Sequence, residues 1–525
     1  LFKVSGCDDK LHVSRFHSKE AISRPFQVEL ELAAENNEID FEQIVGQAGV
    51  LTILGEDEAR YFHGIVSQFE QRGTGVRLTT YHATLVPKLW YLNHRHNCRI
   101  FQQQSVRDIV QKILDEFGIP NDEYRFVFQS PPQQREYCVQ YQESELNFIS
   151  RLLEEEGLFY FFEHEADKHI LVMSNGSSAH KPIVGEPTVI FHERSPGQVS
   201  DEEHIYQFHY SEAVRPGKVT LKDYNFKKPA LNLKGEKQTD HNQALEIYNY
   251  PGVFELPNQG NHLVKIRLEE YQTIKKQGTG ESVCIRFIPG FFYTLSKHQR
   301  NTFNQKYLIT QLNQSATQSQ VLEEGASTEG TTYSNQFHCI PFEVPYRPAR
   351  ITPKPVVEGS QTAIVVGPSG EEIYTDEHGR IKVQFHWDRE GQMNERSSCW
   401  IRVSQLWAGA GWGAMFIPRI GHEVIVDFLE GDPDKPIITG RVYHGTNKPP
   451  YPLPDEKTKS TIKTRSSGES SSSKASFLSN IDSLHDKITS LKDNLSDKKK
   501  VVKNVITAVG IVKDISEANK QRISG

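Results

Sequence analysis

The sequence has few cysteines and no long apolar segment. Its 525 residues include six cysteines, and no two of them form a CxxC pair. Cysteines this sparse do not build a disulfide framework, so we expect free thiols in a reducing compartment. No run of about 18 apolar residues occurs, which is what a transmembrane helix requires. The opening LFKVSGCDDK has no basic stretch followed by an apolar one, so any export would proceed without a secretory signal peptide.

The chain also lacks an excess of positive charge. Its 67 Asp and Glu residues outnumber its 60 Lys and Arg residues, and the formal net charge is −7. The chain as a whole therefore has no electrostatic attraction to nucleic acid, and we expect none as a partner. With 37% hydrophobic and 24% charged residues, the composition is typical of a folded protein. The length predicts about three or four domains.

Two helices stand out among strand-like segments in the N-terminal part. Residues 26–32, FQVELEL, alternate at period two, as a half-buried strand does. Ser105 is placed to cap a helix that ends at Gly118. Its apolar face, at helical spacing, comprises Val106, Ile109, Val110, Ile113, Leu114 and Phe117. A second helix is predicted from Ser144 to Gly157. It is expected to bury Leu146, Ile149, Leu152 and Leu153.

The middle of the chain predicts further strands and then a boundary. Residues 200–320 have strand-like patterns, and the polar residues 316–334 predict a loop or a hairpin tip. Five prolines between positions 341 and 355 predict a stiff connection, with a domain boundary near residue 350.

A compact β-domain is predicted from about residue 356 to residue 455. In GHEVIVDFLEGDPDKPIITGRVYHG (421–445), two strand-like runs flank the turn GDPDKP. Five or so short strands in about 100 residues predict a small barrel of the OB type. Such barrels can bind oligonucleotides, but the acidic residues near the turn oppose a polyanion. Packing in the core and at subunit interfaces is therefore favoured for Trp387, Trp400, Trp407 and Trp412.

The sequence contains no group that points clearly to catalysis or metal binding. His94, His96 and Cys98 share one face of a strand, but no fourth ligand accompanies them, so a structural role is favoured over zinc binding. The HE pair at 422–423 lacks the second histidine of HExxH. The three glutamates 154–156, at a helix C-terminus, favour a solvated face or an inter-subunit salt bridge over acid–base catalysis. We predict a protein that is not an enzyme, with no catalytic, metal-binding or cofactor-binding residue and no cofactor.

Several long stretches occur in an order and at a spacing that identify a family. They are FHSKEAISRPFQVELEL (16–32), LVPKLWYLNHRHNCRIFQQQSVRDIVQKIL (85–114), ESELNFISRLLEEEGLFYFFEH (143–164), LEIYNYPG (245–252), DEHGRIKVQFHWDREG (376–391) and GWGAMFIPRIGHEVIVDFLEGDPDKPIITGRVYH (411–444). On these residues the chain resembles VgrG, the spike protein of the bacterial type VI secretion system. VgrG is similar to the hub and the spike base of contractile phage tails, joined in one chain.

The resemblance implies a mainly β fold with a few helices. Residues 1–345 would form a phage-hub-like region of two β-barrels plus helices. Residues 346–355 would connect it to an OB-fold-like neck at 356–455. Three copies would form a homotrimer whose pseudo-sixfold hub matches a hexameric tube protein.

The resemblance further implies a structural role. The trimer would cap the tube, puncture a target envelope and deliver effectors. Baseplate components and a PAAR-type tip protein would be further partners. The protein would assemble in the bacterial cytoplasm and then be secreted or injected. Two other readings stay open: the hub of a phage-tail-like contractile particle, and a spike whose C-terminal tail is enzymatic or membrane-active.

The C-terminal tail departs from the family pattern, in which a β-helix needle usually follows the neck. Residues 456–475 predict a Ser-rich linker, residues 476–516 a helical coiled coil, and residues 517–525 a tail end. The apolar seam, a candidate trimer interface, comprises Phe477, Ile481, Leu484, Ile488, Leu491, Leu495, Val502, Val505, Val509 and Val512, with Lys498 as its polar member. A single amphipathic helix on the protein's own surface and membrane contact by residues 501–515 are alternatives. The sequence of this tail is compatible both with a natural C-terminus and with an engineered replacement of the β-helix needle.

Overall fold

The computed structural model describes residues 1–55, 59–75, 77–193, 202–318 and 331–465. The chain divides into two compact units, Leu1–Val442 and Tyr443–Gly525. All helices and strands named below belong to the first unit. The predicted coiled-coil seam, from Phe477 to Val512, lies outside the described residues and stays a prediction. None of the helices in the described ranges has the length and hydrophobicity needed to span a bilayer.

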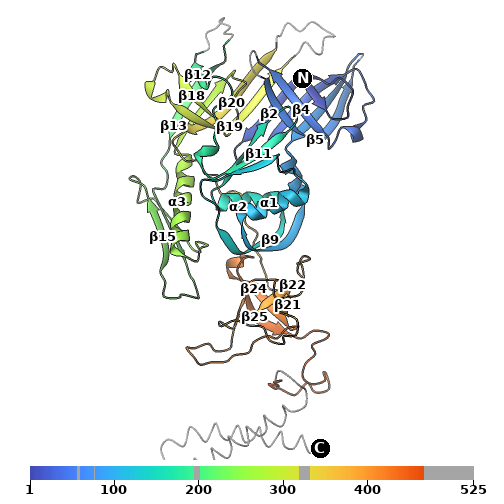
Figure 1. Ribbon diagram of the computed structural model, residues 1–525, viewed down its shortest axis with the longest axis vertical. Coiled ribbons are helices and arrows are strands. Elements are labelled where there is room, and N and C mark those ends of the chain that lie inside the picture. Colours follow the sequence, from blue (N-terminus) through green and yellow to red (C-terminus); the bar gives the residue numbers. More distant parts are fainter. Residues whose placement is uncertain (56–58, 76, 194–201, 319–330, 466–525) are drawn as a thin grey trace, which may run out of the picture. The chain divides into compact units, whose positions relative to one another are not determined.

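Twelve strands form one sheet, and six of them close into a barrel (Figure 1). In sheet order they are β1 (Phe2–Val4), β4 (Ala48–Leu54), β5 (Ala59–Thr74), β6 (Thr79–Val86), β3 (Gln27–Ala34), β2 (His12–Ala21), β19 (Lys306–Thr317), β18 (Phe292–Ser296), β12 (Thr188–Phe191), β13 (His204–Glu212), β17 (Lys276–Ser282) and β20 (Thr332–Pro341). Because β20 also pairs with β19, the ring from β19 to β20 is closed. The other six strands form an antiparallel sheet that joins the barrel where β2 pairs with β19. The family resemblance implied two barrels here, and the pairings among the described residues close one ring.

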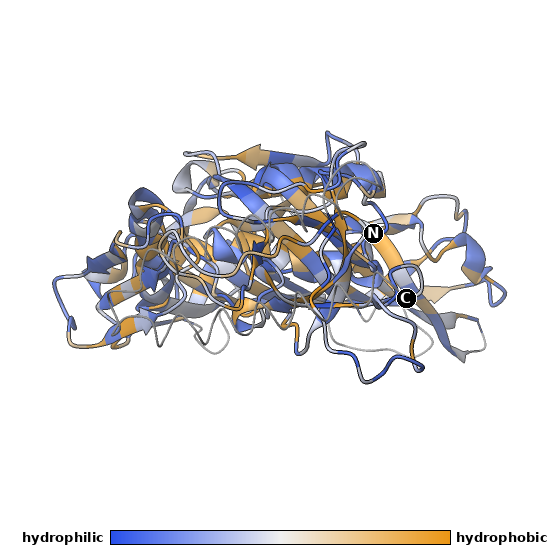
Figure 2. Cartoon of the chain, turned by 90° about the horizontal axis from the view of Figure 1, so that it is seen from below, coloured by the Kyte–Doolittle hydropathy of each residue, from blue (hydrophilic) through white to orange (hydrophobic). Residues whose placement is uncertain are grey.

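Alternating side chains explain how these strands pack. In β3, Val28, Leu30 and Leu32 are buried, whereas Gln27 and Glu31 are exposed. The predicted period of two is thus confirmed for this strand. Hydrophobic and hydrophilic residues alternate along other strands as well (Figure 2). Burying one leucine in this way contributes roughly 2 kcal/mol to the hydrophobic stabilisation.

Both predicted helices are present and begin at the predicted caps. They are α1 (Val106–Phe117) and α2 (Glu145–Glu155). The hydroxyl of Ser105 accepts the N–H of Asp108, whose carboxylate in turn accepts the N–H of Ser105, a complete capping box. Gly118 ends α1 with a φ of 84°, a left-handed conformation that suits glycine. The hydroxyl of Ser144 accepts the N–H of Asn147 at the start of α2. Short sheets accompany them: β7 (His96–Ser105) with β9 (Gln134–Ser144), and β10 (Phe159–His164) with β11 (His169–Ser174) and β8 (Tyr124–Val127).

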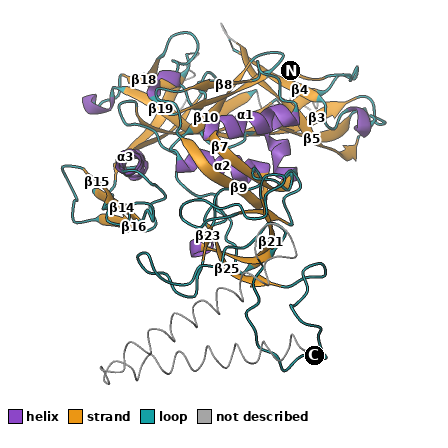
Figure 3. Ribbon diagram, turned by 60° about the horizontal axis from the view of Figure 1, so that its bottom comes forward, coloured by secondary structure: helices purple, strands orange, loops and turns teal. Residues whose placement is uncertain are grey.

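A third helix lies where the sequence predicted strands only. It is α3 (Pro257–Thr273), and it packs beside the sheet of β14 (Lys218–Asp223), β15 (Leu233–Gln238) and β16 (Glu246–Asn249) (Figure 3). The strand prediction for residues 200–320 is wrong for this segment. Its apolar residues are few, so the helical period is weak, and tertiary packing decides the conformation. Val264 and Leu268 share a small core with Val219, Leu221 and Leu233.

The predicted OB-type barrel is confirmed. Its strands, in sheet order, are β22 (Lys382–Phe385), β21 (Gln361–Val366), β24 (Glu423–Phe428), β25 (Pro436–Val442) and β23 (Arg402–Val403). Ile381 and Ile401 exchange both backbone hydrogen bonds, at 3.0 and 2.8 Å, and so connect the first strand to the last. Both isoleucines are buried with Val383, Val424 and Val426 in a single core. A ring of five short strands therefore closes around its own apolar side chains.

Three buried histidines form a chain of hydrogen bonds beneath the large sheet. The N–H of Lys88 donates to Nε2 of His169 at 3.1 Å, so His169 carries its proton on Nδ1. That Nδ1 faces Nδ1 of His63 at 3.0 Å, and the N–H of His63 donates to Nδ1 of His164 at 3.2 Å. Nε2 of His164 lies 3.7 Å from Glu20, a buried carboxylate that also binds Arg60. Nδ1 of His164 and Nε2 of His169 accept these N–H groups only while they carry no proton, so both hydrogen bonds require neutral imidazoles.

Protonation of this histidine chain is therefore unfavourable. Burial, followed by His164 and Lys88, lowers the pKa of His63 to about 4. Burial also lowers the pKa of His164 and of His169. An added proton on Nδ1 of His63 would point at the N–H of His169.

We predict that the free energy of unfolding falls as the pH is lowered from about 6.5 to about 4. In that window the histidines bind protons in the unfolded chain but not in the folded protein, where their pKa values are lower, so acid favours unfolding. Each histidine contributes a slope of up to about 1.4 kcal/mol per pH unit. Urea denaturation at pH 7.5, 6.0 and 5.0 measures the slope, which His63→Asn should reduce. His12→Gln, at an exposed position, is the control, and equal slopes in all three proteins would contradict the assignment.

Candidate functional site: the junction between the barrel region and the OB-type barrel

The segment between the two barrels is bound along its length by α2. Glu154, buried near the end of that helix, accepts the N–H groups of Ile351 and Thr352 at 3.0 and 2.9 Å. Its second oxygen accepts the hydroxyl of Thr352 at 2.9 Å. A carboxylate that accepts backbone N–H groups fixes the path of the chain as well as its charge. The predicted Pro-rich connection is therefore tied to the barrel region.

Arginines from distant segments cap the C-terminal end of α2. The last carbonyls of a helix have no partner within it, and the end carries partial negative charge. Arg267, on α3, donates to the carbonyls of Glu154 and Glu155, the first at 3.2 Å. Arg347 donates to the carbonyl of Gly157 at 3.0 Å and to that of Asn175 at 2.8 Å. Two cations thus compensate a helix end that three glutamates make still more negative.

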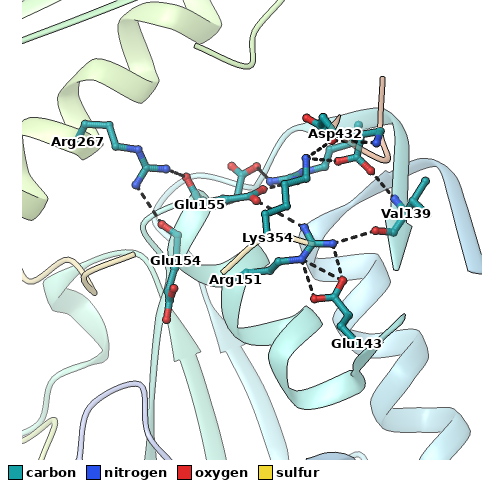
Figure 4. A network of polar contacts seen from close by, with 11 residues as sticks. Val139, Glu143, Arg151, Glu154, Glu155, Arg267, Lys354 and Asp432 are labelled. Atoms are coloured by element: carbon teal, nitrogen blue, oxygen red, sulfur yellow. Dashed lines mark hydrogen bonds and ion pairs between the residues drawn. The ribbon is translucent and has the colours of Figure 1, made fainter. Parts of the chain in front are cut away.

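The three glutamates are mostly buried and paired, so the expectation of a solvated face is wrong. Arg135 binds Glu155 and Glu156, each at 2.8 Å. Burial raises the pKa of Glu155, but the cations around it, Arg135 first, outweigh burial and hold the pKa at about 2. Glu155 therefore stays charged, and all three glutamates serve as anchors through their contacts. Figure 4 shows the network that they enter.

A further buried arginine, Arg151, connects α2 to β9. Its guanidinium binds the carboxylate of Glu143 through Nε and Nη2, at distances from 2.7 to 3.1 Å. Nη2 also donates to the carbonyl of Val139 at 2.9 Å. Both charged side chains are almost fully buried. The planar fork of arginine suits this geometry, since it binds a carboxylate and a carbonyl at once.

The GDPDKP turn of the OB-type barrel docks on this network. Lys354, in the connection, lies 2.7 Å from Asp432 and 2.7 Å from Asp434 (Figure 4). Asp434 also accepts the N–H of Val139, on β9, at 2.6 Å. Burial lowers the pKa of Lys354, but Asp434, Glu155 and Asp432 outweigh it and raise the pKa above its ordinary value. Lys354 thus binds the connection to the OB-type barrel, and Asp434 binds that barrel to β9.

Further contacts between the two barrels lie along the β7–β9 sheet. The amide of Gln361 donates to the hydroxyl of Tyr141 at 2.9 Å and accepts the indole N–H of Trp387 at 2.8 Å. Buried Arg99 lies 3.6 Å from Glu390. The small core of the OB-type barrel also receives Ile100, on β7. Polar and apolar contacts together hold the two regions in one arrangement.

Two of the residues first considered as metal ligands, His94 and Cys98, make structural contacts instead. The ring of His94 packs edge-on against Trp90, and Sγ of Cys98 accepts the N–H of Gln142 at 3.2 Å. Within the described ranges, no three His, Cys, Asp or Glu side chains are grouped so that they could hold a metal ion. The carboxylates of the junction are paired with cations, so the arrangement is suited to fixing positions.

Sequence reasoning identified the GDPDKP turn only as a hairpin connection. The structure adds that its two aspartates bind across the junction. A signal was present, because two carboxylates in a short turn repel each other unless a cation lies between them. The partner Lys354 is about 80 positions away, and periodicity relates no such pair.

We predict that Lys354→Ala lowers the free energy of unfolding by about 2–4 kcal/mol. The substitution leaves Asp432 and Asp434 close together and mostly buried without their cation. Urea denaturation at pH 7 measures the loss. The matched control is Lys435→Ala, because Lys435 is similarly exposed but lies 3.7 Å from Asp223. Without Lys435, Asp223 still accepts the N–H groups of Val253 and Phe254, so we expect a loss of less than about 1 kcal/mol. Equal losses in the two variants would refute the role of Lys354.

Comparison with known sequences matches both barrels to families. Residues 19–320 match the family described as phage tail baseplate hub (GPD). Residues 369–443 match the family described as type VI secretion system/phage-baseplate injector OB domain. Among solved structures, an E. coli type VI secretion component, the c3393 protein, has a TM-score of 0.63 at 22% identity, covering 84% of this chain and 100% of that one. That protein exhibits structural similarity to the T4 bacteriophage tail proteins gp27 and gp5. The match shows a shared fold.

Spike proteins are similar in sequence to most of this chain. VgrG1b of Pseudomonas aeruginosa is 39% identical over 465 residues, which covers 87% of this chain and 62% of VgrG1b. VgrG1a of the same organism is 40% identical over 463 residues, covering 87% of this chain and 71% of VgrG1a. The actin cross-linking toxin VgrG1 of Vibrio cholerae is 40% identical over 477 residues, covering 88% of this chain but 43% of the toxin. The chain belongs to the VgrG family of type VI secretion system spike proteins.

Proposed function

We propose that this protein is the structural, homotrimeric spike and hub of a type VI secretion machine. Three copies cap the hexameric tube protein, and sheath contraction drives them through a target envelope together with effectors. Family membership supports this role, and the junction carries the argument from the structure. Force applied to the hub must reach the neck. Lys354 in the connection binds Asp434 of the neck, Asp434 accepts the N–H of Val139 on β9, and Arg151 binds that part of β9 to α2.

The buried polar contacts suit force transmission for a physical reason. Apolar surfaces can slide past one another with little loss of contact, whereas a hydrogen-bonded ion pair has one favoured geometry. Leaving that geometry exposes an unpaired charge in a region from which water is largely excluded. The neck therefore keeps its orientation while a load is applied to the hub.

The proposed partners follow from this role. They are further copies of the same chain, the hexameric tube protein, baseplate components, effectors and a PAAR-type tip protein. Assembly takes place in the bacterial cytoplasm, and the spike then leaves by secretion or injection. In three copies, the closed six-stranded ring and the open six-stranded sheet of each chain supply the six units that a hexameric tube requires.

The spike is proposed to act without catalysis of its own. The match covers 43% of the actin cross-linking toxin, and the activity in that protein's name is not carried over to this chain. A phage-tail-like contractile particle is a second candidate, because the barrel region matches the phage tail baseplate hub family. The two candidates share the trimer and the neck.

We predict a mass in solution of about three times 59.9 kDa for the full chain. Light scattering after size exclusion measures it. A second protein that stops at residue 467 removes the predicted coiled coil. A trimer that survives this deletion assembles through hub and neck, whereas a fall to monomers assigns assembly to residues 477–512. A full chain that is monomeric at all concentrations contradicts the proposed homotrimer.

A further inference from the structure

The loop after β23 exposes an unusual amount of apolar surface. Five large side chains lie within eleven positions: Leu406, Trp407, Trp412, Met415 and Phe416 are 90%, 64%, 58%, 78% and 45% exposed. The stretch from 406 to 418, LWAGAGWGAMFIP, contains no charged residue. Soluble monomers rarely expose contiguous apolar patches larger than a few hundred Å². This surface, here called the 404–417 loop, therefore requires a covering partner.

The loop is ordered by its own backbone. Ala408 and Gly413 form an isolated β-bridge. The N–H of Gly409 donates to the backbone carbonyl of Trp412, and the N–H of Ala414 donates to that of Trp407, each at 2.8 Å. The two indole rings meet edge to face, with centroids 4.8 Å apart. A side chain at Gly409 would lie 2.4 Å from the ring of Trp412. A surface formed in advance loses little conformational entropy on binding.

The loop lies at the end of the OB-type barrel opposite the junction. β23 runs parallel to β25 and pairs with its first half, at Ile437 and Ile438, so the chain after β23 continues toward the end where β25 finishes. Arg441, near that end, donates to the carbonyl of Phe416. The GDPDKP turn precedes β25 and occupies the other end, where it binds Lys354. Contacts with the hub therefore leave the loop uncovered.

We propose that the 404–417 loops of neighbouring copies pack against one another and hold the necks of the spike together. This assignment rests on the proposed homotrimer and names the surface through which its necks associate. Around a symmetry axis, identical side chains meet their own copies. Apolar groups tolerate such contacts, whereas like charges repel.

Area and charge both favour a second copy as the occupant. From the exposures and the usual sizes of such side chains, the loop offers roughly 600–700 Å². One side of a standard interface buries about 800 Å². A lipid surface fits less well, because segments that bind anionic bilayers present free Lys or Arg beside their apolar residues. Here the neighbouring Arg419 is paired with Glu372, and Arg441 donates to the carbonyl of Phe416.

The experiment compares the full chain with two matched triple variants. One is Leu406→Ser/Trp407→Ser/Met415→Ser in the loop. The control is Tyr224→Ser/Tyr248→Ser/Tyr250→Ser, which removes side chains that are 55%, 57% and 55% exposed around β14 and β16. Light scattering gives the mass at protein concentrations from about 0.5 to about 50 µM, a range that brackets a common interface affinity of about 1 µM. Far-UV circular dichroism checks that each variant is folded. Leu406→Ser alone is the fallback should the triple variant misfold.

The outcomes separate this assignment from the proposed function. A trimeric wild type and control, with a loop variant that dissociates at concentrations at least tenfold higher, support the assignment. A loop variant as trimeric as the wild type overturns it and leaves the homotrimer standing. A monomeric wild type overturns the homotrimer and the assignment with it. A monomeric wild type that floats with phosphatidylglycerol vesicles, while the loop variant does not, identifies a membrane surface as the occupant instead.

Discussion

The C-terminal end of α2 is the point on which the arrangement of the two barrels depends. Three successive glutamates add negative charge to a helix end whose carbonyls already need donors. Burying that helix end without cations would cost free energy, since like charges and unpaired carbonyls would share a poorly solvated region. Arginines from β9, α2, α3 and the connection compensate it. Because the compensating groups come from four segments, satisfying the helix end also fixes where those segments lie.

The two barrels close in different ways, and the difference matters for the junction. The larger ring closes through the long β19–β20 pairing, which spans most of both strands. The OB-type ring closes through the single bridge between Ile381 and Ile401. A ring that closes through one bridge leaves its loops free to take other roles. The GDPDKP turn binds the hub at one end, and the 404–417 loop presents an apolar surface at the other.

Buried polar groups serve specificity more than stability in both networks. A buried ion pair often contributes little net free energy relative to apolar packing, but removing one partner is strongly unfavourable. The histidine chain follows the same logic, because Nδ1 of His164 and Nε2 of His169 accept backbone N–H groups only while they carry no proton. Such groups select one arrangement among those that apolar contacts alone would permit.

The sequence by itself determined the local structure. Alternation fixed the buried face of β3, the cap at Ser105 and the stop at Gly118 bounded α1, and turn residues outlined the OB-type strands. These signals act over a few residues, so a linear pattern contains them. The tertiary structure alone decided α3, whose helical period is weak, and the pairing of Lys354 with Asp432 and Asp434. It also decided that Glu154–Glu156 are anchors instead of a solvated face. In each case the deciding partner lies far along the chain, and only folding brings its charge or apolar surface into contact.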